Sequence, residues 1–357
     1  MTSILCIGDQ HFKPSNVPQV NIFLKKLEEW LSVNHVDMIV SMGDLLHTHE
    51  RLHTQALNKA LDYIHLLRRF AHTYIMVGNH DFQGNYQYLS TNHWLNAIKE
   101  FDNVTVIDTV NIVEIDKIKI VMVPYVPDGK FKTALDTRKG EWEDSTCIFA
   151  HQLFDGAKMG SIVAEDVEKW EIDNPMIFCG HIHDRQWVQD NIYIVGSAMQ
   201  EAFGETEDKT LLLLTLDGKT LDKESLDDTR FRTIDLDLPK KRIIYMEMED
   251  LDKFDMDSLK ENVEYKLTLD GDQEEFEAFK KTVRYKEMIK KVKIVFKHKR
   301  VFIAEKKDYI KSTPTTHKPF NKILEELVSQ ETNPYLTDLF NTIVLKRTDV
   351  KDDILLI

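Results

Sequence analysis

The sequence predicts a layered α/β fold for roughly its first 200 residues, followed by a smaller α/β unit. Short apolar runs there alternate with stretches whose apolar residues recur at helical spacing. Each of the first three apolar runs ends in glycine followed by polar residues. The order strand, helix, strand, helix is typical of a sheet layered with helices. At 357 residues the chain has room for about two domains of ~150 residues each.

The elements follow from these patterns in order along the chain. The first three strands are expected at SILCIG, DMIVSMG and TYIMVG, and the helices between them at VNIFLKKLEEWLSV and TQALNKALDYIHLLRRF. Five later runs are richer in β-branched residues and lie closer together, which predicts further strands with fewer helices between them. These runs are IKIVMVPYV, TCIFAH, MIFCGH, NIYIVGS and TLLLLTL.

The composition changes near DLDLPKK, at 235–241, which we interpret as a domain boundary. Strands are expected beyond it at RIIYMEME, VEYKLTLDG and KVKIVFKHK, and a helical stretch at EEFEAFKKTVRYKEMIKK. A polar linker then leads to two short amphipathic stretches. The predicted domains are therefore 1–237, 238–305 with the small α/β unit, a linker at 306–318, and a helical tail at 319–357.

Composition restricts the protein class. No apolar run approaches the ~18 residues that a membrane-spanning helix needs, and the start, MTSILCIGDQ, lacks the basic lead of a signal peptide. The three cysteines are too few and too scattered for a disulfide framework. We therefore expect a cytoplasmic protein without a membrane partner, in the host cytoplasm if a phage encodes it.

Polar residues follow five of the apolar runs. They are Asp9 and His11, then Asp44 and His47, then Asn79, His80 and Asp81, then His151, then His181 and His183. The carboxyl ends of strands in open α/β sheets meet at one crevice, so these five loops are expected to meet. A set of carboxylates, one amide and imidazoles without cysteine suits Mn(II), Fe(II) or Zn(II).

In this order, Asp-x-His, Gly-Asp, Gly-Asn-His-Asp, a single His and Gly-His-x-His form the signature of the calcineurin-like metallophosphoesterases, which the chain resembles over 1–205. Details at 43–47, VPYVP at 123–127, FAHQ at 149–152 and GSAMQEAFGE at 196–205 resemble the SbcD-type nuclease subunit of DNA break-repair and recombination complexes. The resemblance implies an α/β fold, namely a metallophosphoesterase β-sandwich flanked by helices, with a small capping domain and a C-terminal helical tail.

The resemblance also implies two divalent cations, with Mn(II) preferred over Mg(II), Fe(II) or Zn(II). One would be held by Asp9, His11 and His183, the second by Asn79, His151 and His181, and both by the bridging carboxylate of Asp44.

Three further residues are implied to act on the substrate. His80 would contact the phosphate and protonate or stabilise the leaving oxygen, and Asp81 would accept a hydrogen bond from its other ring nitrogen. His47 resembles a second histidine on the substrate side. The implied activity is a DNA exonuclease or endonuclease that uses a metal-activated water. The alternatives are a phosphatase or phosphodiesterase for small substrates, and a non-catalytic scaffold for DNA ends.

The net charge of −14 is unevenly distributed, because 280–311 holds 13 basic against 3 acidic residues. This segment is either a solvated surface with a lysine-rich edge strand or a contact to the DNA backbone. We favour DNA contact, through Lys290, Lys291, Lys293, Lys297, Lys299 and Arg300.

Two assembly partners are implied besides DNA. Helices expected at 54–70 and 86–98 occupy the places where family members dimerise, and the first would carry an apolar ridge of Leu57, Leu61, Ile64 and Leu67. The amphipathic stretches within 319–345 either pack on the protein itself or dock onto the coiled coil of an SbcC-type ATPase subunit. We favour docking.

Overall fold

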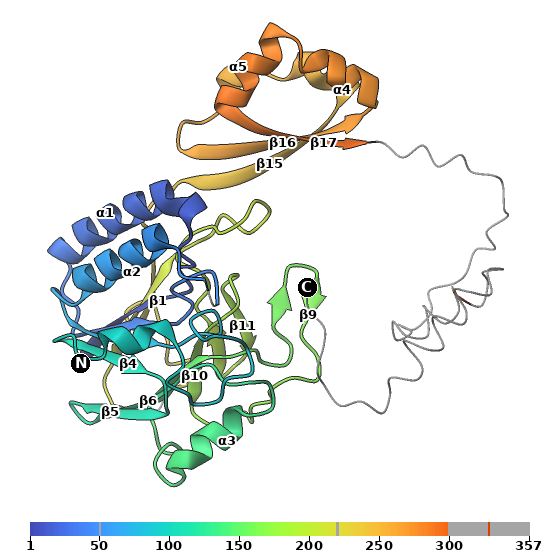
Figure 1. Cartoon of the computed structure of the whole chain (residues 1–357). Helices are drawn as coiled ribbons and strands as arrows, with labels where there is room; N and C mark the ends of the chain where they lie inside the picture. The colour runs from blue at the N-terminus through green and yellow to red at the C-terminus, as the bar shows by residue number, and fades with distance from the viewer. Residues whose placement is uncertain (50, 219–220, 299–327, 329–357) are drawn as a thin grey trace. The chain divides into compact units, whose positions relative to one another are not determined.

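The computed structural model describes residues 1–49, 51–218, 221–298 and 328 (Figure 1). The chain divides into two compact units, Met1–Lys299 and Arg300–Ile357. All the described residues except Val328 belong to the first unit. Within the described residues, no helix is long and apolar enough to cross a membrane.

The first sheet has six strands in the order β14-β13-β1-β2-β3-β4. Their bounds are Thr2–Ile7 for β1, Met38–Ser41 for β2, His72–Met76 for β3, Val104–Ile107 for β4, Leu211–Leu216 for β13 and Phe231–Ile234 for β14. Strands β1 to β4 run parallel, while β13 pairs with β1 and β14 with β13 in the antiparallel sense. Three carboxyl ends, those of β1, β2 and β3, therefore lie side by side.

The second sheet also has six strands, in the order β11-β12-β10-β7-β6-β5. Their bounds are Asn111–Ile115 for β5, Ile118–Val123 for β6, Cys147–His151 for β7, Met176–Gly180 for β10, Gln186–Gln189 for β11 and Ile192–Ile194 for β12. The four inner strands are parallel and the two edge strands antiparallel to their neighbours. A two-stranded hairpin, β8 (Lys158–Met159) and β9 (Ile162–Val163), stands apart from both sheets.

Successive side chains of β1 point to opposite faces of the first sheet and therefore pack into two different cores. Ile4 and Cys6 belong to the core shared with Phe149 of the second sheet. Leu5 belongs to a different core, together with Phe23 of helix α1 (Val17–Val33), which also includes residues of α2 (Thr54–Leu67). Figure 1 shows these two helices along one side of the sandwich and the short α3 (Phe131–Leu135) on the opposite side. The predicted α/β sandwich flanked by helices is confirmed.

Beyond the sandwich lies a parallel three-stranded sheet, β15-β16-β17. Its strands span Lys240–Glu247, Val263–Gly271 and Val292–His298. The single helical stretch expected before β17 is two helices, α4 (Gln273–Phe279) and α5 (Val283–Lys291). The interruption has a local cause, because the Thr282 hydroxyl accepts a hydrogen bond from the Tyr285 backbone N–H at 3.1 Å and caps α5. The predicted domain boundaries remain predictions, and the linker and tail at 306–357 lie outside the described residues apart from Val328.

The helix predicted at 86–98 is wrong, since only Trp94–Ile98 is helical, as a short 3-10 turn. Polar side chains before it bond to their own backbone, as where the Ser90 hydroxyl accepts from the Asn92 N–H at 3.0 Å, which favours turns over helix. In α2, Ile64 and Leu67 are fully buried in the protein's own core. Half of the predicted dimer ridge therefore faces inward.

Candidate metal centre

The loops that carry the predicted ligands come from both sheets of the sandwich. Those after β1, β2 and β3 belong to the first sheet and those after β7 and β10 to the second. Among the bonds that join the sheets at this place, the His181 N–H donates to Asp9 Oδ1 at 2.9 Å, and His151 Nδ1 lies 2.7 Å from the Met42 carbonyl oxygen. The five loops meet as expected, although the crevice lies between two sheets rather than along one.

The backbone at these loops is unusual. Asp9, Asp44 and His181 have φ values of 21°, 53° and 81°, in the left-handed region that residues other than glycine seldom adopt. Glycine is required beside them, because a Cβ on Gly78 would lie 2.2 Å from Asp44 Oδ1, and one on Gly43 2.5 Å from His151 Nδ1. Backbone strain of this kind is typical of functional sites.

The first group of predicted ligands lies together. Asp9, His11 and Asp44 each offer a ligand atom within 4.8 Å of the others, and all three are buried. His11 Nε2 lies 3.5 Å from Asp44 Oδ2, and His183 Nε2 lies 3.0 Å from His11 Nε2. Two ring nitrogens that face each other at this distance can both be ligands of one cation.

The second group lies on the other side of Asp44. The Asn79 carbonyl oxygen, Oδ1, is 2.9 Å from His181 Nδ1 and 3.1 Å from His151 Nε2. His151 Nε2 is also 3.4 Å from Asp44 Oδ1. One carboxylate oxygen of Asp44 thus faces each group, which is the arrangement that a bridging ligand needs.

Two buried atoms in the centre lack partners within the described residues. Asp9 Oδ2 and His11 Nδ1 are inaccessible to solvent and make no hydrogen bond. An unpaired buried carboxylate oxygen is costly in free energy unless a cation is bound to it. Together with a donor set of imidazole nitrogens and carboxylate and amide oxygens, this fits a centre for divalent transition-metal cations.

The pKa shifts of the residues in the centre support the same interpretation. Burial lowers the pKa of His11 well below its ordinary value and that of His181 to about 3, so both rings are neutral and present a lone pair. Burial also opposes a charge on His151, but the carboxylates of Asp44 and Asp9 outweigh it and raise its pKa to about 9. Burial raises the pKa of Asp9 to about 6. Asp9 and His151 therefore hold protons more tightly than usual, because positive charge in the centre offsets its buried carboxylates.

Cations should therefore compete with protons. We expect Mn(II) to raise the Tm more at about pH 8 than at about pH 5.5, because the ligands must release protons to bind. The folded pKa values of Asp9 and His151 both lie above the ordinary ones, so their protons stabilise the metal-free fold most at low pH. That contribution is lost as pH rises through about 6 and about 9. Thermal unfolding with Mn(II) or with EDTA at both pH values measures the effect, and an equal gain at both would contradict it.

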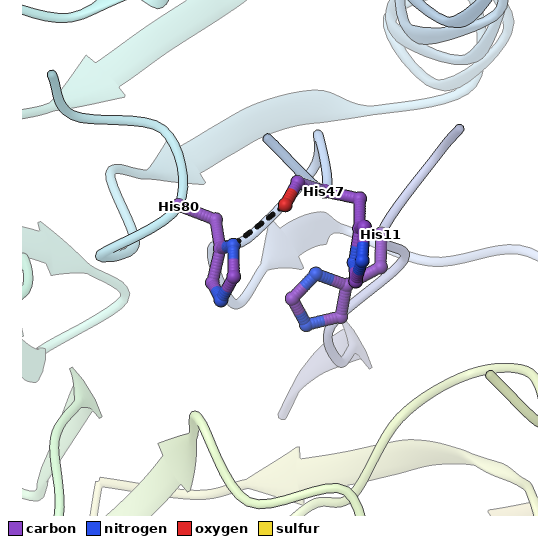
Figure 2. Close-up of side chains that lie close together, drawn as sticks. All are labelled: His11, His47 and His80. Atoms are coloured by element: carbon purple, nitrogen blue, oxygen red, sulfur yellow. Dashed lines mark hydrogen bonds between the residues drawn. The ribbon is translucent and has the colours of Figure 1, made fainter. Parts of the chain in front are cut away.

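His80 lies beside this centre, outside the two groups that share Asp44. It forms a third group with His11 and His47, and these three residues also offer ligand atoms within 4.8 Å of one another. Its Nδ1 lies 2.7 Å from the backbone carbonyl oxygen of His47, as the dashed line in Figure 2 shows, and its ring centroid is 4.8 Å from that of His11. His47 stacks over it at 5.7 Å and His49 at 4.5 Å. The His80 ring is therefore fixed, and its Nε2 is left for another partner.

The prediction that Asp81 accepts from His80 is wrong. Its carboxylate accepts instead from the Gly78 N–H at 3.0 Å, the Leu45 N–H at 3.2 Å and the Trp94 indole N–H at 2.9 Å. The His47 carbonyl already occupies the nitrogen of His80 that Asp81 was expected to bind. Asp81 therefore joins the loop after β2 to the loop after β3.

Two ion pairs near the centre were not anticipated. Lys13 Nζ lies 2.6 Å from Glu201 Oε2, which in turn lies 3.9 Å from His47 Nδ1. Burial, then Lys13, lower the pKa of His47 to about 4. The second pair joins Glu205 and Lys209 at 3.2 Å. Both glutamates lie in GSAMQEAFGE, a stretch that the sequence singled out without assigning its residues a role.

Three of the six predicted DNA contacts line a cavity of about 620 Å³. They are Lys290, Lys291 and Lys293, and the same cavity is lined by Lys13 and Lys241. Lys297 lies elsewhere, with its ammonium 5.6 Å from the centroid of the Tyr245 ring. Lys299 and Arg300 lie outside the described residues.

Comparisons with known proteins identify the family of this chain. Residues 2–185 match the family model described as calcineurin-like phosphoesterase. The chain is 45% identical over 248 residues to "Putative phosphoesterase 244L" of Invertebrate iridescent virus 6, which covers 69% of this chain and 86% of the relative. It is 43% identical over 250 residues to "Putative phosphoesterase 078R" of Invertebrate iridescent virus 3, covering 70% of each. A solved structure of a protein of unknown function from Aquifex aeolicus is 17% identical and covers 43% of this chain and 81% of that chain, with a TM-score of 0.27, too low to bear on the fold.

Proposed function

The chain belongs to the calcineurin-like phosphoesterase family, and from this premise we propose that it is a DNA nuclease of the SbcD type, dependent on Mn(II). Its general class is that of a phosphoesterase-type hydrolase. The family uses divalent metals, and the choice of DNA as substrate and of Mn(II) as cation are the proposed parts. Phosphodiester cleavage in a break-repair or recombination complex is the proposed setting.

The observation that supports a polymeric substrate is the lysine-lined cavity. Lys13, Lys241 and Lys290 line it together with Lys291 and Lys293, against the acids Glu201 and Glu264. Glu201 also lies 3.9 Å from His47, so the cavity begins next to the metal centre. Five lysines that line one cavity next to the reacting phosphate suit the neighbouring phosphates of a nucleic acid strand. A small phosphomonoester has no neighbouring phosphates that could contact these lysines.

In the proposed mechanism the protein's residues bind two cations and transfer a proton. One cation would be held by Asp9, His11, His183 and Asp44, and the other by Asn79, His151, His181 and Asp44. Two bound cations would supply Lewis acidity and would lower the pKa of a water molecule towards ~7. Asn79 adds a ligand oxygen without adding negative charge. The fixed His80 ring is placed to donate a proton to the departing oxygen.

One experiment separates the candidate functions. Purified protein with Mn(II) is incubated with linear single-stranded and double-stranded DNA, and in parallel with p-nitrophenyl phosphate and a cyclic nucleotide. We expect DNA cleavage that EDTA abolishes. Hydrolysis of the small esters alone would identify a small-substrate phosphatase or phosphodiesterase, and DNA binding without any hydrolysis would identify a scaffold.

Neutralising the cavity tests DNA contact directly. We expect the triple change Lys290→Ala, Lys291→Ala and Lys293→Ala to weaken DNA binding in EDTA at least tenfold at low salt. The slope of log Kd against log salt should fall by roughly 0.7–0.9 for each DNA phosphate that the variant no longer neutralises. Fluorescence anisotropy with a labelled strand gives both quantities.

The matched control is Lys253→Ala, which removes an exposed lysine of the same unit that pairs with Asp250 and does not line the cavity. It should leave DNA binding unchanged. Equal binding by the triple variant and the wild type would assign these lysines to a solvated surface.

We also propose the assembly that the family resemblance suggests. A homodimer would give twice the chain mass of 41.8 kDa in light scattering, and a monomeric mass would reject it. The proposed docking segment for an SbcC-type ATPase, 319–345, lies outside the described residues apart from Val328. Its support is the pattern of apolar residues in the sequence. Unchanged co-purification of that partner after Leu336→Glu and Leu339→Glu would reject it.

A further inference from the structure

The carboxylate of Glu205 lies against His183, at the edge of the metal centre. Its Oε1 lies 3.2 Å from His183 Nδ1 and accepts from the Ala202 N–H at 3.2 Å. Its Oε2 accepts from the Glu201 N–H at 2.9 Å. The loop that carries Glu205 thus fixes its carboxylate against one ring nitrogen of a predicted ligand.

Lys209 completes this arrangement. Its ammonium lies 3.2 Å from Glu205 Oε2 and donates to the backbone carbonyl oxygen of His183 at 2.8 Å. The side chain of Lys209 is 5% exposed and that of Glu205 16%, so solvent screens the pair little. The pair of Glu205 and Lys209 therefore holds His183 both by its ring and by its backbone, and Lys209 also lies 3.5 Å from Asp184 Oδ1.

The contact determines which nitrogen of the ring faces the metal centre. A carboxylate only accepts, so Nδ1 must carry the hydrogen, and the lone pair is then on Nε2. That atom lies 3.0 Å from His11 Nε2, inside the first ligand group. By contrast, the outer nitrogen of His151 bonds to the neutral carbonyl of Met42. A carboxylate in this position raises the basicity of a ligating imidazole more than a carbonyl does.

We propose that Glu205, supported by Lys209, is the positioning residue for His183 and strengthens the cation site formed by Asp9, His11, His183 and Asp44. It would not touch substrate. The inference rests on the metal centre of the proposed function and is independent of whether DNA is the substrate. It makes the two cation sites unequal, with the site that contains His183 the one that depends on Glu205.

Isothermal titration of Mn(II) into full-length, metal-stripped protein tests the proposal without any substrate. Glu205→Ala should weaken one of two binding events by about 10–100-fold and leave the other within about threefold. Glu205→Gln keeps an acceptor oxygen but loses the charge, so it should weaken the same event by a smaller factor of about three to ten. Glu207→Ala is the matched control, since Glu207 lies two residues further on and pairs with Arg242.

Wild-type affinity for both cations in Glu205→Ala would overturn the proposal, as would an equal loss of both in the two Glu205 variants. Thermal unfolding in EDTA shows whether each variant is folded. If the alanine variant does not fold, the glutamine variant decides, and unchanged Mn(II) binding there would reject a positioning role. Because no DNA is present, failure of the nuclease assay leaves this result unaffected.

Discussion

Asp44→Ala is expected to abolish metal-dependent hydrolysis. The two carboxylate oxygens of Asp44 face different ligand groups, with Oδ2 3.5 Å from His11 Nε2 and Oδ1 3.4 Å from His151 Nε2. Oδ1 also accepts from the His80 N–H at 2.8 Å. The side chain therefore links both cation sites to the loop that carries His80, and its removal should disturb both sites at once.

The expected size of the effect follows from what the cations supply. Metal ions contribute several kcal/mol of transition-state stabilisation, and each ~1.4 kcal/mol is a factor of ten in rate. We therefore expect kcat to fall by about three orders of magnitude or more, and elemental analysis to find fewer than two metal equivalents. More than a tenth of the wild-type rate in Mn(II) would exclude a bridging role.

The control lies at the other end of the same strand. Asp37 precedes β2, whereas Asp44 follows it, and Asp37 accepts from the Ser3 N–H and hydroxyl, both at 2.8 Å. Asp37→Ala should lower stability modestly and leave both the metal content and kcat unchanged. Comparing the two variants separates loss of the centre from general weakening of the sheet.

The strands that the sequence predicted and those it did not differ in their position within the sheets. The central strands β1, β2, β3, β7 and β10 are almost completely buried, so they appear as continuous apolar runs. The unpredicted strands β4, β5, β11 and β14 are the four edges of the two sheets. Strand β11 is half-buried along its whole length, and its QWVQ sequence gives no apolar run. Edge strands carry mixed side chains, so their pattern is weak.

In the metal centre, too, some features could be predicted from the sequence and others could not. Residue types at the strand ends were sufficient to predict which side chains meet, because burial and strand direction bring them together. The orientation of the His80 ring was not predictable, since it depends on a hydrogen bond to a backbone carbonyl oxygen. The partner of His80 is the carbonyl oxygen of His47, a group that every residue possesses, so the sequence favoured the adjacent carboxylate of Asp81 instead. The role of Glu205 likewise depends on the loop that folds back towards His183.

His80→Ala is expected to lower kcat by about 10²–10⁴-fold while both cations remain bound. The ring bonds through Nδ1 to the His47 carbonyl at 2.7 Å. It lies outside the two ligand groups that share Asp44, although His80, His11 and His47 each offer a ligand atom within 4.8 Å of the others. Because Nδ1 donates to that carbonyl, Nε2 is the nitrogen that can transfer a proton. Removal of the His80 ring should therefore slow the chemical step, while elemental analysis should still find two metal equivalents. Release of one cation from the variant would show that His80 is a ligand.

The leaving group provides the sharper test. A proton donor matters most when the departing oxygen is strongly basic, as in DNA, and little when it is p-nitrophenolate. We expect the ratio of wild-type to His80→Ala rates to be at least tenfold larger for an oligonucleotide than for bis(p-nitrophenyl) phosphate. His49→Ala is the matched control, because His49 stacks on His80 at 4.5 Å and belongs to neither ligand group. It should reduce both rates by a similar, small factor. An equal ratio for the two substrates in His80→Ala would mean that His80 stabilises charge on the phosphate rather than protonating the leaving oxygen.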